Sequence, residues 1–192
     1  MPVLTRLDLP GSAEAWSALA FDLSSGAFLV GTVACAIGAE PGWAFDELRG
    51  DAAPLGVPTD VADANAPGPG HPNGIDRIDH VVYTVANLDD AVGALTSVLG
   101  APPRRRFHPR GPDGPEMAFF RVGECFIEVV SSGRPAELTG VAFNSPDLDA
   151  TVRAVREAGG PIGDPKPAVQ GGRIASVWRD HVGYPVAVME PR

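Results

Sequence analysis

A repeated segment limits the fold of this chain more than any other feature of its sequence. The stretches ANLDDAV at 86–92 and SPDLDATV at 145–152 align with Leu88 opposite Leu148. Each stretch follows an apolar, strand-like run and leads into a helical pattern of apolar residues. Self-similarity of this kind indicates a duplicated structural unit. We therefore expect the second part of the chain to contain two copies of one module.

The first copy begins with a β-branched and aromatic run at 78–85, which is typical of a strand. Asn87 is a good N-cap for the helix that follows, and Gly100 is placed to end it. Three further strands are expected at 104–109, 116–122 and 124–131, with the last two joined in a hairpin at Gly123.

The second copy repeats this order with different local signals. A strand is expected at 138–144 and a helix at 145–158, with Ser145 as its N-cap and Pro146 in its first position. Two strands at 174–179 and 185–189 form the closing hairpin. The order of strand, helix and strands indicates an α+β protein of repeated βαβββ modules.

A shorter, fainter copy precedes these two. The run LVGTVACAI at 29–37 aligns with RVGECFIEV at 121–129, with Gly31 opposite Gly123. Between the copies, residues 50–74 are rich in Pro, Gly, Ala and Asp and have no sustained period. The predicted division is therefore a degenerate module at 1–49, a linker or long surface loop at 50–74, and a larger domain at 75–192, whose modules are 75–133 and 137–192.

Composition excludes several classes of partner. The 192 residues carry a formal charge of −9 without a stripe of Lys and Arg, which argues against nucleic acid and anionic membranes. The longest apolar stretch, 27–38, is too short to cross a bilayer, and no leader sequence is visible. Cys35 and Cys125 lie in apolar runs, as free thiols in a reducing compartment do. We expect a soluble cytoplasmic protein.

One basic cluster stands out against this acidic background. Arg104, Arg105 and Arg106 are consecutive, and Arg110 lies close by. Such a cluster is either a solvated strand end or a clamp for an anionic substrate.

Three motifs, in this order, carry a family resemblance: IDHVVYTVANLDDA, VGECFIEVV and WRDHVGYPVAVMEP. With them, residues 75–192 resemble the vicinal oxygen chelate superfamily. This superfamily includes glyoxalase I, extradiol dioxygenases, methylmalonyl-CoA epimerase, fosfomycin-resistance proteins and bleomycin-binding proteins. The resemblance implies paired βαβββ modules whose curled mixed sheets enclose a cleft, often with one divalent metal ion.

The same resemblance implies site residues. Enzymes of the superfamily take metal ligands from the first and last strands of each module, and here His80 and Glu128 occupy those positions. Gly140 and Ala187 stand at the equivalent positions of the last module, and Leu4 and Ala36 at those of the front one. The pair His80 and Glu128 suits Zn, Ni, Mn or Fe. Two ligands are fewer than a catalytic zinc normally has, so a hydrogen-bonded pair acting as a general base is the alternative.

Two functions of different classes therefore stay open. The first is a lyase, isomerase or dioxygenase that acts on a small molecule beside a carbonyl group or vicinal oxygens. The second is a metal-free protein that binds a small molecule or antibiotic, as bleomycin-resistance proteins do. A homodimer could gather His80 and Glu128 from both chains into one site. His71, His108 and His181 lie in loop-like or turn-like sequence and are expected to be solvated.

Overall fold

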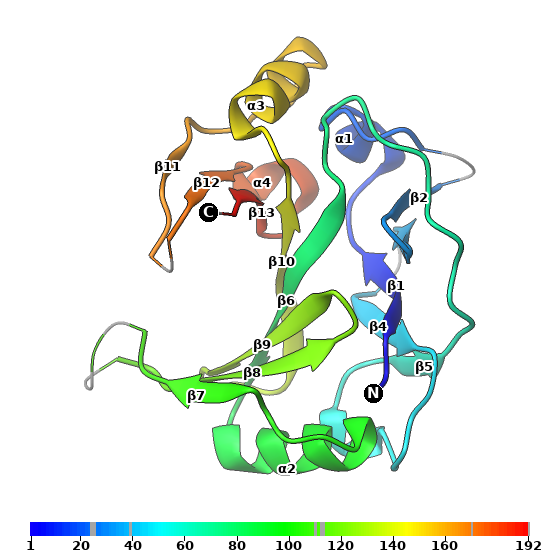
Figure 1. Ribbon diagram of the computed structural model, residues 1–192, viewed down its shortest axis with the longest axis vertical. Coiled ribbons are helices and arrows are strands. Elements are labelled where there is room, and N and C mark those ends of the chain that lie inside the picture. Colours follow the sequence, from blue (N-terminus) through cyan, green and yellow to red (C-terminus); the bar gives the residue numbers. More distant parts are fainter. Residues whose placement is uncertain (24–25, 39, 110, 112–113, 170, 192) are drawn as a thin grey trace.

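Two mixed β-sheets lie side by side in the computed structural model (Figure 1). The structure describes residues 1–192 except 24–25, 39, 110, 112–113, 170 and 192. The larger sheet is formed by the second part of the chain. Its elements and the helices between them are β6 (Arg77–Val85), α2 (Leu88–Leu99), β7 (Arg105–Phe107), β8 (Met117–Val122), β9 (Cys125–Ser131), β10 (Glu137–Asn144), α3 (Leu148–Glu157), β11 (Lys166–Pro167), β12 (Arg173–Ser176), α4 (Arg179–Val182) and β13 (Val186–Glu190).

The order of strands in the larger sheet shows the duplication directly. The order is β11-β12-β13-β10-β6-β9-β8-β7. In each half the first strand runs parallel to the last, β6 beside β9 and β10 beside β13. The halves join through the antiparallel pair β6 and β10. The predicted α+β fold of βαβββ modules is confirmed, and over the described residues the sheet stays open, with β7 and β11 at its edges.

The helix of the first module begins and ends as its sequence indicates. The side chain of Asn87 accepts hydrogen bonds from the backbone N–H groups of Asp89 and Asp90. Gly100 ends the helix in the left-handed conformation, with φ 65°. One face of α2, including Leu95 and Val98, is buried against the sheet.

The helix of the second module begins later than predicted. Its N-cap is Asp147, not Ser145, because the Asp147 carboxylate accepts the N–H of Ala150 at 2.9 Å. The Ser145 hydroxyl instead accepts the N–H of Asp147, at 3.2 Å, and forms the turn before the helix. Pro146 therefore precedes the cap and is not in the first helical turn.

A β-bulge interrupts the central strand pair. Ala142 lies opposite His80, but Phe143 lies opposite Ile78, so Asp79 is an extra residue in β6. An extra residue of this kind breaks the alternation of side chains between the two faces of a strand. Ile78 and Val81 on either side are both buried, whereas Asp79 and His80 are both partly exposed.

The smaller sheet is formed by the front of the chain and has the order β2-β3-β1-β4-β5. Its strand directions match those of β8-β9-β6-β10-β13, five consecutive strands of the larger sheet. The smaller sheet is thus a reduced copy of the larger. Its elements are β1 (Leu4–Leu9), α1 (Ala13–Ser17), β2 (Ala27–Val30), β3 (Val33–Ile37), β4 (Gly42–Phe45), the 3₁₀ helix η1 (Ala53–Leu55) and β5 (Thr59–Val61).

The register of β1 corrects one alignment. Glu128 lies opposite Val82, and Ala36 lies opposite Asp8. If Ala36 is equivalent to Glu128, the residue equivalent to His80 stands two places before Asp8. That residue is Arg6, not Leu4.

Apolar side chains hold the two sheets together. Trp43 of β4 packs on Tyr83 of β6, with ring centroids 5.2 Å apart. Trp16 of α1 meets Phe143 of β10 edge-on at 6.4 Å. Both tryptophans are fully buried in one continuous core that extends across both sheets. The smaller sheet therefore covers the buried face of β6 and β10 and leaves their other face open.

The segment 50–74, predicted as a linker or surface loop, is partly built into the smaller sheet. It contains η1 and β5, and β5 pairs in parallel with β4. His71 is buried, and not solvated as predicted, because Nδ1 accepts the N–H of Asp22 at 3.1 Å and Nε2 donates to the carbonyl of Leu29 at 2.7 Å. The domain division itself stays a prediction. Among the described residues, no helix is long and apolar enough to cross a membrane.

Candidate functional site

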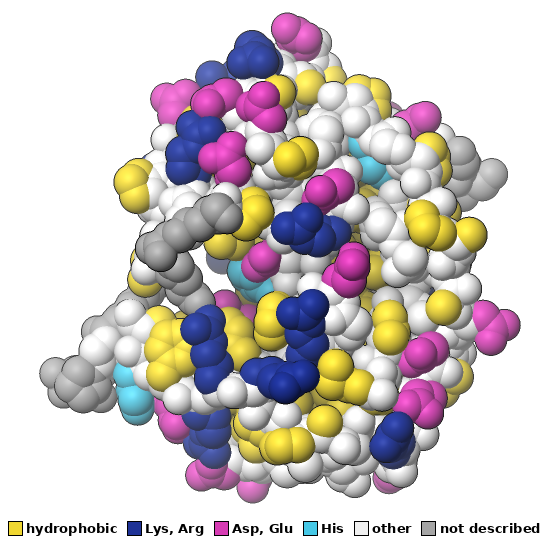
Figure 2. Space-filling model, viewed as in Figure 1, with side chains coloured by type: hydrophobic (Ala, Val, Ile, Leu, Met, Phe, Trp, Pro, Cys, Tyr) yellow, Lys and Arg dark blue, Asp and Glu magenta, His cyan; other side chains and the backbone are white. Residues whose placement is uncertain are grey.

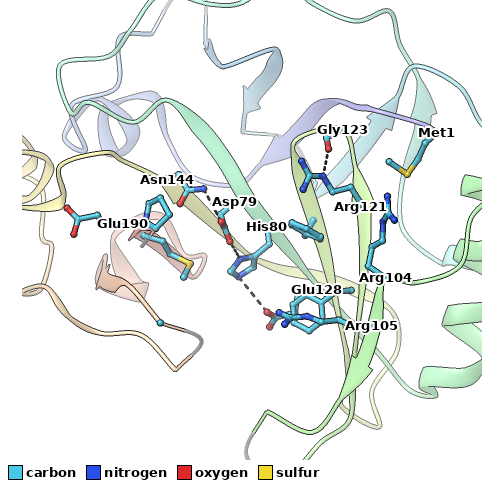
Figure 3. A pocket seen from close by; sticks show the side chains of 15 residues that line it. Met1, Asp79, His80, Arg104, Arg105, Arg121, Gly123, Glu128, Asn144 and Glu190 are labelled. Carbon is cyan, nitrogen blue, oxygen red and sulfur yellow. Dashed lines mark hydrogen bonds and ion pairs between the residues drawn. The ribbon is translucent and has the colours of Figure 1, made fainter.

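A cavity of about 900 Å³ lies on the open face of the larger sheet. In the space-filling view, a histidine lies within a hollow and Lys and Arg side chains gather beside it (Figure 2). Figure 3 shows the side chains that line the cavity. The polar and charged ones are Asp79, His80, Arg104, Arg105, Arg121, Glu128, Asn144 and Glu190, and the apolar ones include Phe119, Phe126 and Met189.

His80 is oriented by its neighbour in the sequence. Its Nδ1 lies 2.7 Å from Oδ2 of Asp79 (Figure 3). A carboxylate accepts hydrogen bonds only, so Nδ1 carries the proton. In the neutral ring Nε2 then has a lone pair, and it lies 3.8 Å from Oε2 of Glu128. The structure thus brings together the two residues that the sequence singles out, and adds Asp79 to them.

Asp79 reaches the cavity because of the bulge in β6. Regular alternation would place it on the face opposite to His80, inside the core. With Asp79 as the extra residue, both side chains point to the open face. The pair Asp79-His80 is visible in the sequence, but strand periodicity assigns its members to opposite faces, so sequence reasoning missed Asp79.

Asn144 holds the other oxygen of Asp79. Its Nδ2 donates to Oδ1 of Asp79 at 2.9 Å, and its side chain is buried. Burial favours a higher pKa for Asp79, but the hydrogen bond and charge of His80, the Asn144 hydrogen bond and the charge of Arg77 together lower that pKa below its usual value. Asp79 is therefore a carboxylate at neutral pH, fixed at both oxygens.

Glu128 is the second carboxylate of the site. It belongs to β9 and lies opposite Val82 of β6, the strand that also carries His80. The side chain of Glu128 is 15% exposed. Its separation from His80 is longer than a hydrogen bond. Nε2 of His80 and the carboxylate of Glu128 are therefore close to each other but not hydrogen-bonded.

The donor set does not fit a tightly held metal ion. Members of the superfamily commonly use divalent metals, and a carboxylate on Nδ1 also orients histidines that bind metal through Nε2. Here, however, Asp79 sits on the far side of the ring from Nε2 and cannot share an ion with Glu128. Among the described residues, no group of three or more His, Cys, Asp or Glu side chains could hold a metal ion.

The second module adds no ligand at the matching positions. Ala142 lies opposite Ala187, and the same counting places Gly140 where the first module has His80. Glu190 lines the cavity, but its carboxylate accepts hydrogen bonds from Arg173 and from the N–H of Leu148. It is turned away from His80 (Figure 3).

The basic cluster divides between two surroundings. Arg106 forms ion pairs with Asp89 and Glu116, at 2.8 Å each, and does not line the cavity. Arg104 and Arg105 do line it. Arg110 lies outside the described residues. Arg121 of β8, which the sequence did not single out, is the third arginine of the cavity.

The other candidate groups stay outside the site. Burial raises the pKa of the Cys35 and Cys125 thiols well above the usual range, so neither is a nucleophile. His108 is exposed, and its Nδ1 lies 2.9 Å from the carbonyl of Gly114. His181 of α4 contacts the carbonyl of Ala15 through Nε2 at 2.8 Å.

The comparisons with known proteins agree with this fold. The profile of the Glyoxalase/Bleomycin resistance protein/Dioxygenase superfamily matches residues 77–188. No curated protein matches the chain. The duplicated sheet and its cavity define a glyoxalase-like protein. The chain belongs to the Glyoxalase/Bleomycin resistance protein/Dioxygenase superfamily.

Solved structures share this fold over about 60% of the chain. Methylmalonyl-CoA epimerase from Mycobacterium tuberculosis is 21% identical, with a TM-score of 0.53 over 62% of this chain and 90% of that one. A hypothetical protein from Bacillus halodurans is 18% identical, with a TM-score of 0.51 over 60% of this chain and 94% of that one. The third structure is a single-substitution variant of the Streptomyces coelicolor methylmalonyl-CoA epimerase in complex with 2-nitronate-propionyl-CoA. It is 17% identical, with a TM-score of 0.51 over 61% of this chain and 95% of that one. At these identities the likeness establishes the fold alone.

Proposed function

We propose that this chain is an enzyme of the lyase or isomerase type that moves a proton at a carbon beside a carbonyl group, with His80 as the base. One observation carries the proposal. Asp79 holds the proton of His80 on Nδ1, which leaves the lone pair of Nε2 on the cavity side, next to Glu128. A fixed imidazole with a carboxylate hydrogen-bonded behind it is suited to general base catalysis.

The proposed step balances as a proton transfer. The C–H bond beside the carbonyl breaks, its electrons form an enolate, and the proton moves to Nε2 of His80. The resulting imidazolium is stabilised by Asp79, which stays ionised because its pKa is lowered. Guanidinium groups that line the same cavity stabilise the negative charge of the enolate.

Glu128 supplies the second proton carrier. It lies on the same open face as His80 and can exchange a proton with the substrate from a neighbouring position. The proton passes from the imidazolium to Glu128 and from Glu128 back to the substrate, so both groups end as they began. Its return to the other face of the same carbon gives an epimer, and its return to another atom of the enolate gives an isomer. A positioned acid or base of this kind contributes about 10²–10⁴-fold to the rate.

Two other proposals share the same cavity. In one, His80 and Glu128 hold a divalent metal ion of the Zn, Ni, Mn or Fe group, and further ligands come from the substrate or from a second chain of a homodimer. In the other, the cavity only binds an antibiotic or another small molecule. The donor set of two is why acid–base catalysis is preferred over the first. The fixed Asp79-His80 pair, which binding alone does not require, is why it is preferred over the second.

Hydrogen exchange tests the proposal without knowledge of the product. Purified protein is incubated in D₂O with a panel of carbonyl compounds that carry an acidic C–H, and deuterium uptake is followed by mass spectrometry. The panel includes methylmalonyl-CoA, as a compound related to those named for the structural neighbours. Exchange that is lost in His80→Gln and kept in His108→Gln supports the proposal, because His108 lies outside the cavity.

The same samples distinguish the alternatives. Exchange that depends on added Zn²⁺ or Ni²⁺ and disappears with a chelator would favour the metal proposal. Tight binding of a panel compound with no exchange in wild type would favour the binding protein.

A further inference from the structure

Two arginines line one side of the cavity. In Figure 3, Asp79, His80 and Glu128 lie in the middle, with Asn144 and Glu190 on one side of them and Arg104 and Arg121 on the other. The position of Arg104 is fixed by its backbone, whose N–H donates to the carbonyl of Phe119 at 2.7 Å. Positive charge is thus gathered on one side of the acid–base group.

Arg121 is held in place but keeps much of its hydrogen-bonding capacity. Its Nε donates to the carbonyl of Gly123 at 2.6 Å, and its guanidinium lies 5.0 Å from the ring centre of Phe126. These contacts fix the plane of the group. Within the described residues, the two Nη groups of Arg121 have no carboxylate partner, and neither does the side chain of Arg104.

Several other arginines of the chain are paired with acids, and Arg134, Arg153 and Arg179, which have no ion pair within the described residues, lie outside this cavity. Arg106 lies between Asp89 and Glu116, and Arg173 lies between Asp149 and Glu190. With 24 Asp and Glu residues against 15 Lys and Arg, acidic partners are plentiful. Arg104 and Arg121, in the same cavity as His80, therefore have guanidinium donors available to an anion from outside the chain.

The strand register places this positive side at a defined distance from the base. His80 lies opposite Phe126, and Phe126 lies opposite Arg121, so the three form one row across β6, β9 and β8. Residues in one row share a face, and two strand spacings separate His80 from Arg121 by about 10 Å between Cα atoms. Both side chains extend from the sheet into the cavity, with the Phe126 ring between them.

We propose that Arg104 and Arg121 bind a carboxylate or phosphate group of the substrate, a few bonds from the carbon whose proton His80 removes. This inference rests on the proposed function for the reacting carbon, but the anion subsite has its own evidence. Binding energy from the anion would hold the C–H bond against Nε2. The substrate class is then small anionic carbonyl compounds, with an apolar part against Phe119 and Phe126.

Calorimetric titration with minimal anions tests the subsite. The probes are malonate, inorganic phosphate and the neutral analogue malonamide. The variants are Arg104→Gln, Arg121→Gln and, as a control with the same change of charge, Arg153→Gln on the exposed face of α3, outside the cavity. Thermal melting checks that Arg121→Gln, which loses a backbone contact, is folded. Arg104 has an exposed side chain, so its variant keeps the test valid if Arg121→Gln does not fold.

We expect at least one anion to bind wild type and to lose about ten- to a hundredfold in affinity in the Arg104 and Arg121 variants, with no change for Arg153→Gln. Preference for malonate assigns a carboxylate, and preference for phosphate assigns a phosphoryl group. Equal binding of malonamide, equal loss in the control, or no binding of either anion to wild type would overturn the subsite. His80→Gln separates the two proposals, because it should abolish exchange and leave anion affinity unchanged.

Discussion

Asp79 and His80 are consecutive in β6, yet both side chains lie on the open face of the sheet and form a hydrogen bond of 2.7 Å. Neighbouring residues of a regular strand point to opposite faces. The bulge that removes this alternation therefore creates the polar centre of the cavity. A carboxylate supplied from the adjacent position is also held by the same backbone that holds the imidazole.

Asp79→Asn should lower the proton-exchange activity by about a hundredfold or more. A neutral amide cannot stabilise the imidazolium, and it allows Nδ1 and Nε2 to exchange tautomers. The rate of deuterium uptake measures the effect. Asp76→Asn is the control. It makes the same change of charge three residues away, and Asp76 does not line the cavity. Full activity of Asp79→Asn would show that His80 works without an orienting carboxylate.

Ala187→Glu should raise the affinity for Zn²⁺ or Ni²⁺, on the order of tenfold. Ala142 of β10 lies between His80 of β6 and Ala187 of β13, and the three form one row across the sheet. The new carboxylate would therefore lie on the same face as the imidazole. Titration with each metal measures the gain. Ala187→Gln has the same size without the charge, and identical metal binding by both variants would show that the two ligands do not converge.

Glu190→Gln should make thermal stability less dependent on pH in the acid range. Hydrogen bonds from Arg173 and from the N–H of Leu148 lower the pKa of Glu190. A lowered folded-state pKa contributes stability that is present above the unfolded pKa and is lost as pH falls through the folded value. Melting temperatures at a series of pH values below neutrality measure this. Glu157→Gln on exposed α3 is the control, and parallel curves for wild type and Glu190→Gln would contradict the prediction.

Trp43→Ala should destabilise the whole protein by about 3–5 kcal/mol, because its fully buried ring fills the contact between the sheets at Tyr83. The free energy of unfolding by urea measures the loss. Trp178→Ala removes a ring that is 67% exposed and should have little effect. If only the smaller sheet unfolds in Trp43→Ala, the front of the chain is a separable unit and the joint core is not cooperative.

The fold was predictable because its signals are local. The Leu88 and Leu148 repeat, the Asn87 cap and the Gly123 turn each depend on a few adjacent residues, and the structure has them where the sequence indicates. His80 and Glu128 were found through the resemblance to the superfamily, because the second copy of the repeat has Gly140 and Ala187 at their places.

What could not be predicted depends on contacts between distant segments. The bulge at Asp79 arises from the pairing of β6 with β10, which no period within β6 reveals. His71 is buried by partners 49 and 42 residues away, and Arg121 joins the cavity through the register of β8. The composition of residues 50–74 predicts a loop. It does not reveal β5, because that strand has only three residues and is stabilised by its pairing with β4.

The bulge has a consequence for how such a site can arise and be lost. The polar pair depends on the number of residues between Ile78 and Val81, not only on their identity. Deletion of the codon for Asp79 would restore a regular strand. His80 would then face the cavity without a carboxylate at its Nδ1. In this chain the number of residues in a strand, and not only their type, decides whether a histidine has a carboxylate beside it.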